Sequence, residues 1–347
     1  MTLIKTFWIL LCSSVLVLAE GIFFRKEIIR HAGDLLSEIA EPFAASQVHF
    51  LLWTRRNSFL FQELFINDVN VLAASSYVKT KPTKIYVHGF TENGQGDLSF
   101  RLRNRFLEKE DINFIAVDWA LLAAGPDYPR AAANTRLVGL LTGDFVNFLV
   151  SQGTDLIKLH LIGFSMGAHV VGLAGHIANG VLPRITGLDP AFPHFDFTNP
   201  DEVLEKTDAQ FVDVIHTNAG KLENGKIGVD RSIGHVDFWP NGGSSQPGCI
   251  EIPNSSAGIL SIMNLFLGGI CSHRRAVEYF MESLDVPFIA TRCNSYDEFK
   301  LGSCTNNFKT FLGVPVSTSA VGNFFLDTNV PHTVRQENSF QSIFKTT

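Results

Sequence analysis

The stretch LHLIGFSMGAHVVGLAGHI, residues Leu159–Ile177, decides the fold class of this chain. Its first part, Leu159–Phe164, is an apolar run typical of a buried strand, and its last part, Met166–Ile177, has the pattern of a helix. Ser165 lies between the two, at the centre of a G-x-S-x-G pentapeptide. In this setting the pentapeptide indicates a sharp turn that holds a nucleophilic serine above a sheet. Both glycines are needed because a side chain at either position would collide with neighbouring backbone.

The chain on both sides of this stretch alternates strand-like and helix-like segments. Strand-like segments are further predicted at 84–87, 114–117, 185–188, 211–215, 236–239 and 322–326. Apolar residues at helical spacing predict helices at 97–109, 130–150 and 274–283. This alternation predicts an α/β fold with a mostly parallel central sheet and helices on both faces. No long linker rich in Pro, Gly or Ser divides the chain, so one domain is expected.

The composition excludes a disordered chain and argues against nucleic-acid binding. The 347 residues are 46% hydrophobic and 18% charged, and 34 acidic residues against 28 basic ones give a net charge of -6. The mean hydropathy of +0.14 is high for a soluble protein. Some of the apolar residues should therefore belong to a targeting segment or to a surface that faces lipid.

The N-terminal residues 1–19 have the layout of a secretory signal peptide. Lys5 is followed by an apolar run from Phe7 to Leu18 and by a small-residue cleavage site before Glu20. We expect residues 20–347 to form the secreted, extracellular protein, with 27 basic and 34 acidic residues and a charge of -7. No later stretch is convincing as a membrane span.

The cysteines agree with secretion. Cys12 would be removed with the signal peptide, and an even set remains: Cys249, Cys271, Cys293 and Cys304. In an oxidising compartment these predict two disulfides, and the sequential pairing 249–271 with 293–304 is one of three connectivities. A zinc site is disfavoured because no C-x2-C pair exists. Asn254 begins an N-x-S glycosylation sequon.

A serine nucleophile needs an acid and a base, which should follow it in the order Asp or Glu, then His. Asp189 ends the strand-like run 185–188, at the sheet edge where sites of α/β folds form. Four other acidic residues compete with it: Asp196, Asp201, Asp208 and Asp213. His273, beside Cys271, is one candidate base, and position alone leaves His216 and His235 as rivals.

The oxyanion of an acyl-transfer reaction needs two backbone N-H donors. The residue after the nucleophile, Met166, supplies one. The segment His88-Gly89-Phe90 follows an earlier strand, and the N-H of Phe90 is the second expected donor.

Eight short segments occur together and in order: His88–Phe90, Val117–Trp119, Gly163–His169, Gly187–Ala191, Asp208–Thr217, Gly234–Phe238, Pro240–Gly243 and Cys271–Arg274. In these segments the sequence resembles the pancreatic lipase family of α/β hydrolases, from about Val48 to the C-terminus. The resemblance implies an α/β-hydrolase fold, a triad of Ser165, Asp189 and His273, and oxyanion donors at Phe90 and Met166.

The resemblance also implies a function. A disulfide between Cys249 and Cys271 would close a lid, residues 249–271, over an acyl-binding groove. This segment and the loop Asn218–Gly234 are long, which in the family favours triacylglycerol as substrate over the phospholipid of a phospholipase A1. A catalytically silent lipid carrier or yolk-type storage protein is the alternative of another class.

The family further suggests what the reaction requires. The chemistry needs no cofactor, and a structural calcium ion is expected between Asp189 and Asp208, where Asp208 matches a ligand position but Glu205 stands in place of the usual Asp. The chain ends at Thr347, which leaves no room for the C-terminal β-sandwich of the digestive members, so a colipase partner is not expected. The expected partners are a lipid interface and a glycerolipid substrate.

Overall fold

The computed structural model describes residues 43–199, 202–249 and 269–329. The chain divides into two compact units, 1–46 and 47–347, and the sheet, its covering helices and the candidate site all belong to the second unit. The expected signal peptide 1–19, the sequon at Asn254, the candidate acid Asp201 and lid residues 250–268 lie outside the described residues.

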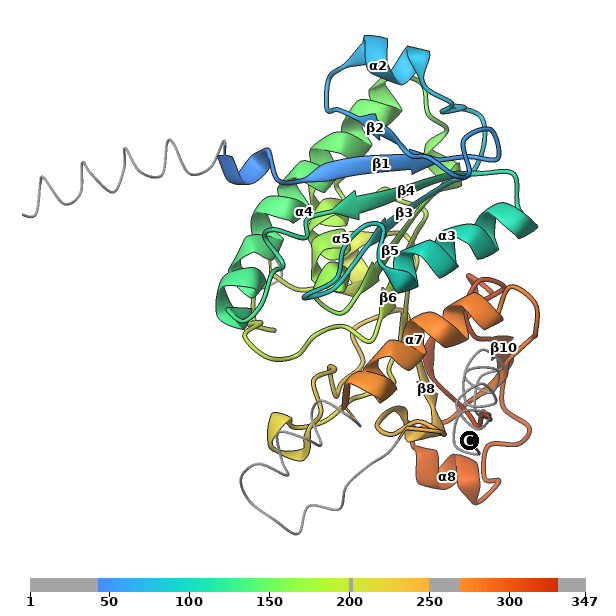
Figure 1. Cartoon of the computed structure of the whole chain (residues 1–347). Helices are drawn as coiled ribbons and strands as arrows, with labels where there is room; N and C mark the ends of the chain where they lie inside the picture. The colour runs from blue at the N-terminus through green and yellow to red at the C-terminus, as the bar shows by residue number, and fades with distance from the viewer. Residues whose placement is uncertain (1–42, 200–201, 250–268, 330–347) are drawn as a thin grey trace, which may run out of the picture. The chain divides into compact units, whose positions relative to one another are not determined.

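A single large sheet runs through the second unit (Figure 1). Its strands are β1 (His49–Trp53), β2 (Gln62–Leu64), β3 (Thr83–Val87), β4 (Asn113–Asp118), β5 (Leu159–Phe164), β6 (Arg184–Leu188), β7 (Val212–Ile215), β8 (Val236–Pro240), β9 (Ile289–Arg292), β10 (Lys309–Phe311) and β11 (Gly322–Leu326). Among the described residues they lie in the order β10-β9-β11-β8-β7-β6-β5-β3-β4-β1-β2.

The central strands confirm the predicted parallel sheet. All neighbours from β4 through β3, β5, β6, β7 and β8 to β11 pair in parallel. The strands at both edges, β1 with β2 and β9 with β10, pair antiparallel instead. The parallel strands all end at one edge of the sheet, which is where α/β folds form their sites.

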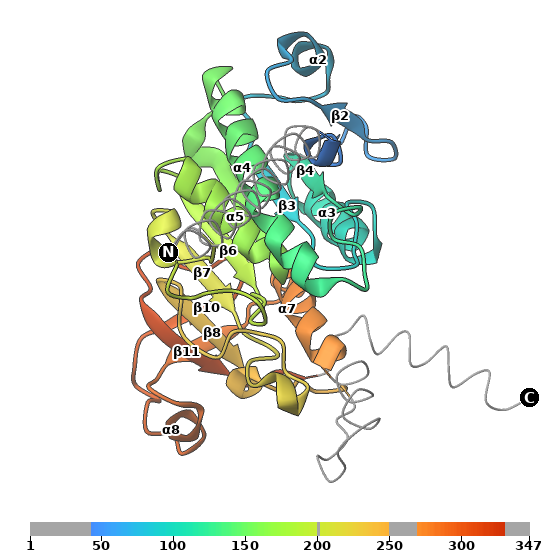
Figure 2. The same ribbon diagram turned by 90° about the vertical axis from the view of Figure 1, so that its left-hand side faces the viewer.

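Helices lie on both faces of this sheet (Figures 1 and 2). The α-helices are α2 (Val69–Ala74), α3 (Asp97–Lys109), α4 (Tyr128–Ser151), α5 (Met166–Ile177), α7 (Ile270–Glu282) and α8 (Tyr296–Lys300). Short 3-10 helices are η1 (Leu156–Lys158), η2 (Lys206–Asp208), η3 (Leu222–Asn224) and η4 (Asn241–Gly243).

The sheet separates two apolar cores. Residues of α4 and α5 belong to one buried cluster, and residues of α3 and α7 belong to the other. Strand β3 serves both, because Ile85 and Val87 belong to the first cluster and Tyr86 to the second. This is the alternation expected of a strand that is covered on both faces.

Two helices begin earlier than the apolar pattern predicted. Helix α4 starts at Tyr128, because Asp127 caps it by accepting from the Arg130 N-H and a proline is tolerated in the first turn. Helix α7 starts at Ile270 rather than at 274, which places Cys271 and His273 in its first turn. The first turns of both helices lack apolar residues at helical spacing, so the apolar pattern could not reveal where the helices begin.

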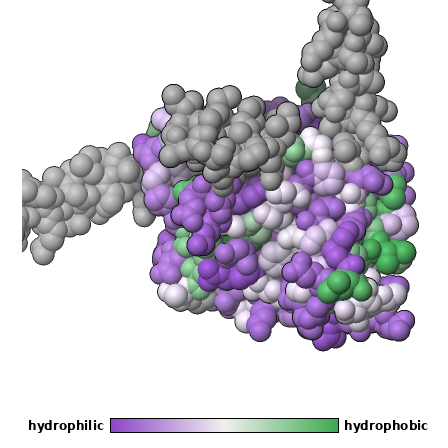
Figure 3. Space-filling view, turned by 90° about the horizontal axis from the view of Figure 1, so that it is seen from below, coloured by the Kyte–Doolittle hydropathy of each residue, from purple (hydrophilic) through white to green (hydrophobic). Residues whose placement is uncertain are grey.

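Both disulfides are present, in the sequential pairing. Cys249 is bonded to Cys271, and Cys293 is bonded to Cys304. In the described ranges no helix is long and apolar enough to span a bilayer. Seen from below, the described surface is mostly hydrophilic, with hydrophobic residues in separate patches (Figure 3).

Candidate active site

The turn between β5 and α5 places Ser165 at the carboxyl edge of the sheet. Ser165 has φ 56° and ψ -121°, a strained conformation for a residue with a side chain. A Cβ atom on Gly163 would lie 2.2 Å from the Gly167 carbonyl oxygen, and one on Gly167 would lie 2.2 Å from the Val87 carbonyl oxygen. The turn therefore requires both glycines of the pentapeptide.

Asp189 and His273 are brought together across the sheet edge. His273 Nδ1 lies 2.5 Å from Asp189 Oδ2, and both side chains are buried. The other oxygen of Asp189 accepts hydrogen bonds from the backbone N-H groups of Thr217 (2.7 Å) and Asn218 (3.0 Å). Because the carboxylate accepts from Nδ1, neutral His273 has an unprotonated Nε2 that can take a proton.

Ser165 and His273 line one pocket of about 380 Å³. Within the described part of the chain, His273 Nε2 is buried and has no hydrogen-bond partner. The ring of Phe164 packs on the imidazole with centroids 4.6 Å apart. The pocket is largely apolar, with Phe90, Tyr128 and Ile227 in its lining. The free Nε2 and the serine thus share an apolar cavity that can receive an ester.

The loop after β3 carries Phe90 against the serine. A Cβ atom on Gly89 would lie 2.9 Å from Ser165 Cβ, so the loop can come this close only with a glycine there. His88 holds the loop: its Nε2 accepts from the Trp119 N-H at 3.1 Å, so its Nδ1 donates to the Gly89 carbonyl at 2.9 Å. Glu92 adds a carboxylate oxygen that accepts from the Gly89 N-H at 3.3 Å.

The two expected oxyanion donors flank the serine. Met166 is the first residue of α5, so its N-H is one that a helix leaves without an internal partner. Phe90 lies in the pocket lining beside Ser165. In the described ranges no hydrogen bond engages either backbone N-H group. Both are thus available to a negative oxygen.

The rival residues have other partners. Asp213 forms a bidentate ion pair with Arg184, with N-O distances of 2.7 and 2.9 Å. Asp196 accepts from Thr198. His216 lies 2.8 Å from Asp237 and stacks on Trp239, and His235 accepts from the Val212 N-H. Of the described candidates, only Asp189 and His273 are paired beside the pocket that contains Ser165.

Asp208 and Glu205, the expected calcium ligands, form a capping box at η2. Asp208 Oδ2 accepts from the Glu205 N-H at 2.8 Å, and in the described residues its buried Oδ1 has no partner. Burial raises the pKa of Asp208 to about 8, and the Glu205 carboxylate adds to the rise. No group of three His, Cys, Asp or Glu side chains that could hold a metal occurs in the described ranges. Since Ca²⁺ takes about 6–8 oxygens, these two residues alone do not form its site.

Comparison with known proteins decides the family. The family model named Lipase matches residues 29–329, which is most of the chain. The chain belongs to the lipase family. The match starts earlier than the resemblance noted from Val48, and it confirms the predicted membership.

Curated lipase relatives are identical to the chain at more than a third of the aligned positions. Lipase member H of Xenopus tropicalis is 37% identical over 302 residues, which cover 86% of this chain and 61% of that protein. Pancreatic triacylglycerol lipase of Mus musculus is 38% identical over 277 residues, with 76% and 58% covered. Inactive pancreatic lipase-related protein 1 of Homo sapiens is 38% identical over 264 residues, with 74% and 56% covered. The chain therefore spans about 60% of the length of these lipases.

Among solved structures, a phospholipase/carboxylesterase from Dyadobacter fermentans is 14% identical, with 40% of this chain and 68% of that chain covered and a TM-score of 0.31. The fold of this lipase-family chain follows from its own sheet, whose parallel order and covering helices are those of an α/β hydrolase.

Sequence reasoning did not find the groups that hold Asp189 and the Gly89 loop. Thr217 and Asn218 act on Asp189 through backbone N-H groups, which no side-chain pattern reveals. Glu92 lies three residues after Gly89 in a loop without periodicity. The only sequence signal for these contacts is that Thr217 and Glu92 lie in the loops that follow β7 and β3.

Proposed function

We propose that this protein is a serine carboxylester hydrolase that cleaves glycerolipids through an acyl-enzyme. One observation carries the proposal: the 2.5 Å contact between His273 Nδ1 and Asp189 Oδ2 leaves Nε2 without a partner in the described residues, in the pocket that Ser165 lines. A nucleophile, a base held by an acid, and free N-H donors together make the arrangement for acyl transfer.

The proposed reaction has two halves. Ser165 attacks the ester carbonyl while His273 Nε2 takes the hydroxyl proton, and the N-H groups of Phe90 and Met166 stabilise the oxyanion. The imidazolium then gives the proton to the leaving alcohol. In the second half His273 activates a water that releases the fatty acid from Ser165. Asp189 keeps the imidazole oriented and stabilises its charge. The present structure has no hydrogen bond between Ser165 and His273, so this contact must form when substrate binds.

Triacylglycerol is the proposed substrate class, and phospholipid is the alternative. The pocket lining is mainly apolar, which suits acyl chains, and its described residues include one acidic and one basic side chain, Glu92 and Arg274, so their opposite charges favour neither head group. The relatives include proteins named pancreatic triacylglycerol lipase. Release of fatty acid from triolein and from phosphatidylcholine, each in mixed micelles at matched concentration, separates the two classes of activity.

We propose that the protein is secreted. The pairing of all four cysteines downstream of the expected signal peptide supports an oxidising compartment. N-terminal sequencing of protein collected from the medium of expressing cells should begin at Glu20. Deglycosylation should lower the apparent mass of this protein, and Asn254→Gln should remove that change.

A catalytically silent lipid-binding protein is the competing function, because one relative is itself named inactive. Purified protein should release fatty acid from triolein and should react with a serine-directed phosphonate. Ser165→Ala should abolish both while its circular dichroism and melting temperature stay close to those of the wild type. A wild-type protein that neither hydrolyses esters nor takes up the phosphonate would support the silent function.

A further inference from the structure

Gln246 lies between η4 and Cys249, and its buried amide makes four hydrogen bonds. Nε2 donates to the carbonyl oxygens of Thr217 and Pro240, both at 3.0 Å. Oε1 accepts from Asn241 Nδ2 at 2.9 Å and from the Tyr279 hydroxyl at 3.2 Å. A carboxamide has two donor hydrogens and one acceptor oxygen with two lone pairs, so these contacts use all of them.

The orientation of this amide is fixed. Exchange of its oxygen and nitrogen would set a donor against Asn241 Nδ2 and an acceptor against two carbonyl oxygens. Burial raises the pKa of Tyr279 to about 12, so the phenol keeps its proton and donates. A fully bonded buried polar group of this kind is rigid.

Thr217 connects Gln246 to both the acid and the base. Its carbonyl accepts from Gln246, and its backbone N-H donates to Asp189 Oδ1 at 2.7 Å. Its hydroxyl donates to the carbonyl of His273 at 3.3 Å. A single residue therefore separates Gln246 from each member of the Asp189–His273 pair.

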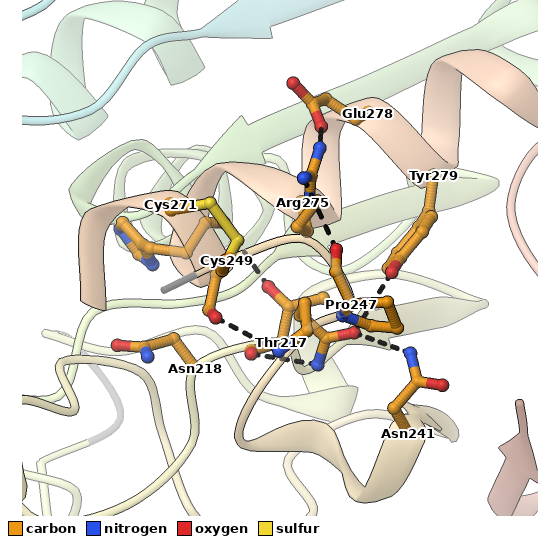
Figure 4. Close-up of a disulfide and its surroundings, with 12 residues drawn as sticks. Thr217, Asn218, Asn241, Pro247, Cys249, Cys271, Arg275, Glu278 and Tyr279 are labelled. Atoms are coloured by element: carbon orange, nitrogen blue, oxygen red, sulfur yellow. Dashed lines mark hydrogen bonds and ion pairs between the residues drawn. A yellow bond between two sulfur atoms is a disulfide. The ribbon is translucent and has the colours of Figure 1, made fainter. Parts of the chain in front are cut away.

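Gln246 is also attached to α7, the helix that carries His273 and, as Figure 4 shows, Cys271 and Tyr279. Its backbone N-H donates to Ser272 Oγ at 3.1 Å, and Tyr279 belongs to the same helix. Its carbonyl accepts from the N-H of Cys249, whose sulfur is bonded to Cys271. The first turn of α7 is thus tied to the Gln246 segment by hydrogen bonds and by a covalent bond.

We propose that Gln246 is a positioning residue. Its amide joins the Thr217 backbone to α7 and so keeps Asp189 and His273 at hydrogen-bonding distance from each other. The inference rests on the proposed function, because Gln246 would affect catalysis only through Asp189 and His273. Gln246 itself takes part in no step of the reaction. Loss of the amide would leave the Thr217 and Pro240 carbonyls, Asn241 and Tyr279 without one partner each. The strand-end loop and the helix could then shift relative to each other, and a misplacement of about 1 Å can cost roughly 100-fold in rate.

Gln246→Met tests this inference, because methionine has a similar length and volume but cannot replace the four bonds. Asn113→Leu is the matched control. Asn113 is buried at the start of β4, away from the carboxyl edge, and its amide makes three hydrogen bonds, to the Val78 N-H and carbonyl and to the Thr83 hydroxyl. Both substitutions remove a buried amide network, so both should lower the melting temperature.

The readout is kcat per active site, measured on full-length protein with p-nitrophenyl butyrate, a soluble ester that needs no interface. Active sites are counted by stoichiometric labelling with a fluorescent phosphonate. We expect Gln246→Met to lower kcat per labelled site by about 10- to 100-fold with KM changed less than about threefold, and Asn113→Leu to leave kcat per site within about twofold. The acid limb of the kcat/KM profile should also move to lower pH in Gln246→Met, because a displaced carboxylate stabilises the His273 imidazolium less.

The possible results are distinct. Unchanged kcat per labelled site and an unchanged pH profile in Gln246→Met would overturn the inference. A wild-type protein that takes up no phosphonate would overturn the proposed function instead. If Gln246→Met does not fold, Tyr279→Phe, which removes one bond to the Gln246 amide, decides the question: a fall of kcat per site of about threefold or more supports the inference, and a smaller change refutes it.

Discussion

The two oxygens of the Asp189 carboxylate face different partners: Oδ2 lies 2.5 Å from His273 Nδ1, and Oδ1 accepts from the backbone N-H groups of Thr217 and Asn218. These two N-H groups fix the plane of the carboxylate. The orientation of His273 therefore depends on the backbone that follows β7, as well as on Asp189 itself.

Asp189→Asn should preserve the fold and remove most of the activity. An amide at this position can donate to Nδ1, which would favour the tautomer that carries its proton on Nε2, so His273 could not accept from Ser165. We expect kcat to fall by about 10³- to 10⁴-fold, measured on a soluble ester.

Asp213→Asn is the matched control for that substitution. Asp213 is equally buried, but its partner is Arg184. Removal of its charge should cost roughly 3 kcal/mol in the free energy of unfolding, from the uncompensated Arg184, with kcat per active site nearly unchanged. Similar losses of kcat in both variants would argue against the assignment of Asp189.

The glycines of the serine turn should tolerate no side chain. Alanine at Gly163 or at Gly167 would bring Cβ within 2.2 Å of a backbone oxygen. We expect a loss of about 3 kcal/mol or more in the free energy of unfolding, measured by urea denaturation, or a failure to fold. Gly153→Ala is the comparison: its φ is +88° but no atom lies within 4 Å of the added Cβ, so the cost should be about 1 kcal/mol.

The two disulfides should differ in their effect on catalysis. Cys249–Cys271 closes a span of 22 residues next to His273, and Cys293–Cys304 closes a span of 11 residues elsewhere. Replacement of either pair by serine should cost about 3 kcal/mol of stability. Only the 249–271 pair should also lower kcat per labelled site, because it anchors the first turn of α7. Equal kcat values for both double variants would show that this anchor is dispensable.

Asp208 should make stability depend on pH. Its pKa is about 8 in the folded protein and near 3.9 when unfolded, so between these values unfolding releases a proton. The free energy of unfolding should therefore fall as pH rises from about 4 to about 8, by several kcal/mol, and level off above that. Asp208→Asn should flatten this dependence, as measured by urea titrations in EDTA.

The same titrations test the expected calcium ion. A bound cation would favour the ionised Asp208, so added CaCl₂ should raise stability at pH 8 and reduce the slope of the wild type. Calcium should have no such effect on Asp208→Asn. An identical response of both proteins to calcium would place any ion away from Asp208.

The sequence predicted the parallel core of the sheet well and its edges poorly. Strands β5 and β11 have the predicted bounds, because each is five or six residues long and most of its residues are apolar. The edge strands β2 (Gln62–Leu64) and β10 (Lys309–Phe311) have three residues each, too few to show alternation. Their pairing depends on tertiary contacts that no local pattern contains.

The candidate site was also predicted only in part from the sequence. Ser165 follows from a local pattern, because its turn is set by five consecutive residues. Asp189 and His273 are 84 residues apart, so spacing could not choose among the rival acids and bases, and the family resemblance made that choice. Gln246 and Thr217 were missed because they act through an amide and through backbone groups, which have no signature in a single sequence.

Glu92 should control the loop that carries the Phe90 N-H. Its carboxylate accepts from the Gly89 N-H, and its own N-H donates to the Gly89 carbonyl, both at 3.3 Å. Burial raises the pKa of Glu92, against the lowering effect of His88 and of the Gly89 N-H. Glu92→Gln keeps an acceptor oxygen for Gly89, whereas Glu92→Ala removes it. We expect kcat on a soluble ester to stay within about threefold in Glu92→Gln and to fall about tenfold in Glu92→Ala.

A comparison of the two Glu92 variants separates a structural role from an electrostatic one. If the hydrogen bond to Gly89 holds the loop, the glutamine variant resembles the wild type because the acceptor remains. If the negative charge instead matters to His273, both variants should lose its stabilisation of the imidazolium, and the acid limb of their kcat/KM profiles should shift to lower pH together. A profile that is unchanged in Glu92→Gln, with a lower kcat only in Glu92→Ala, is the outcome expected from the contacts around Gly89.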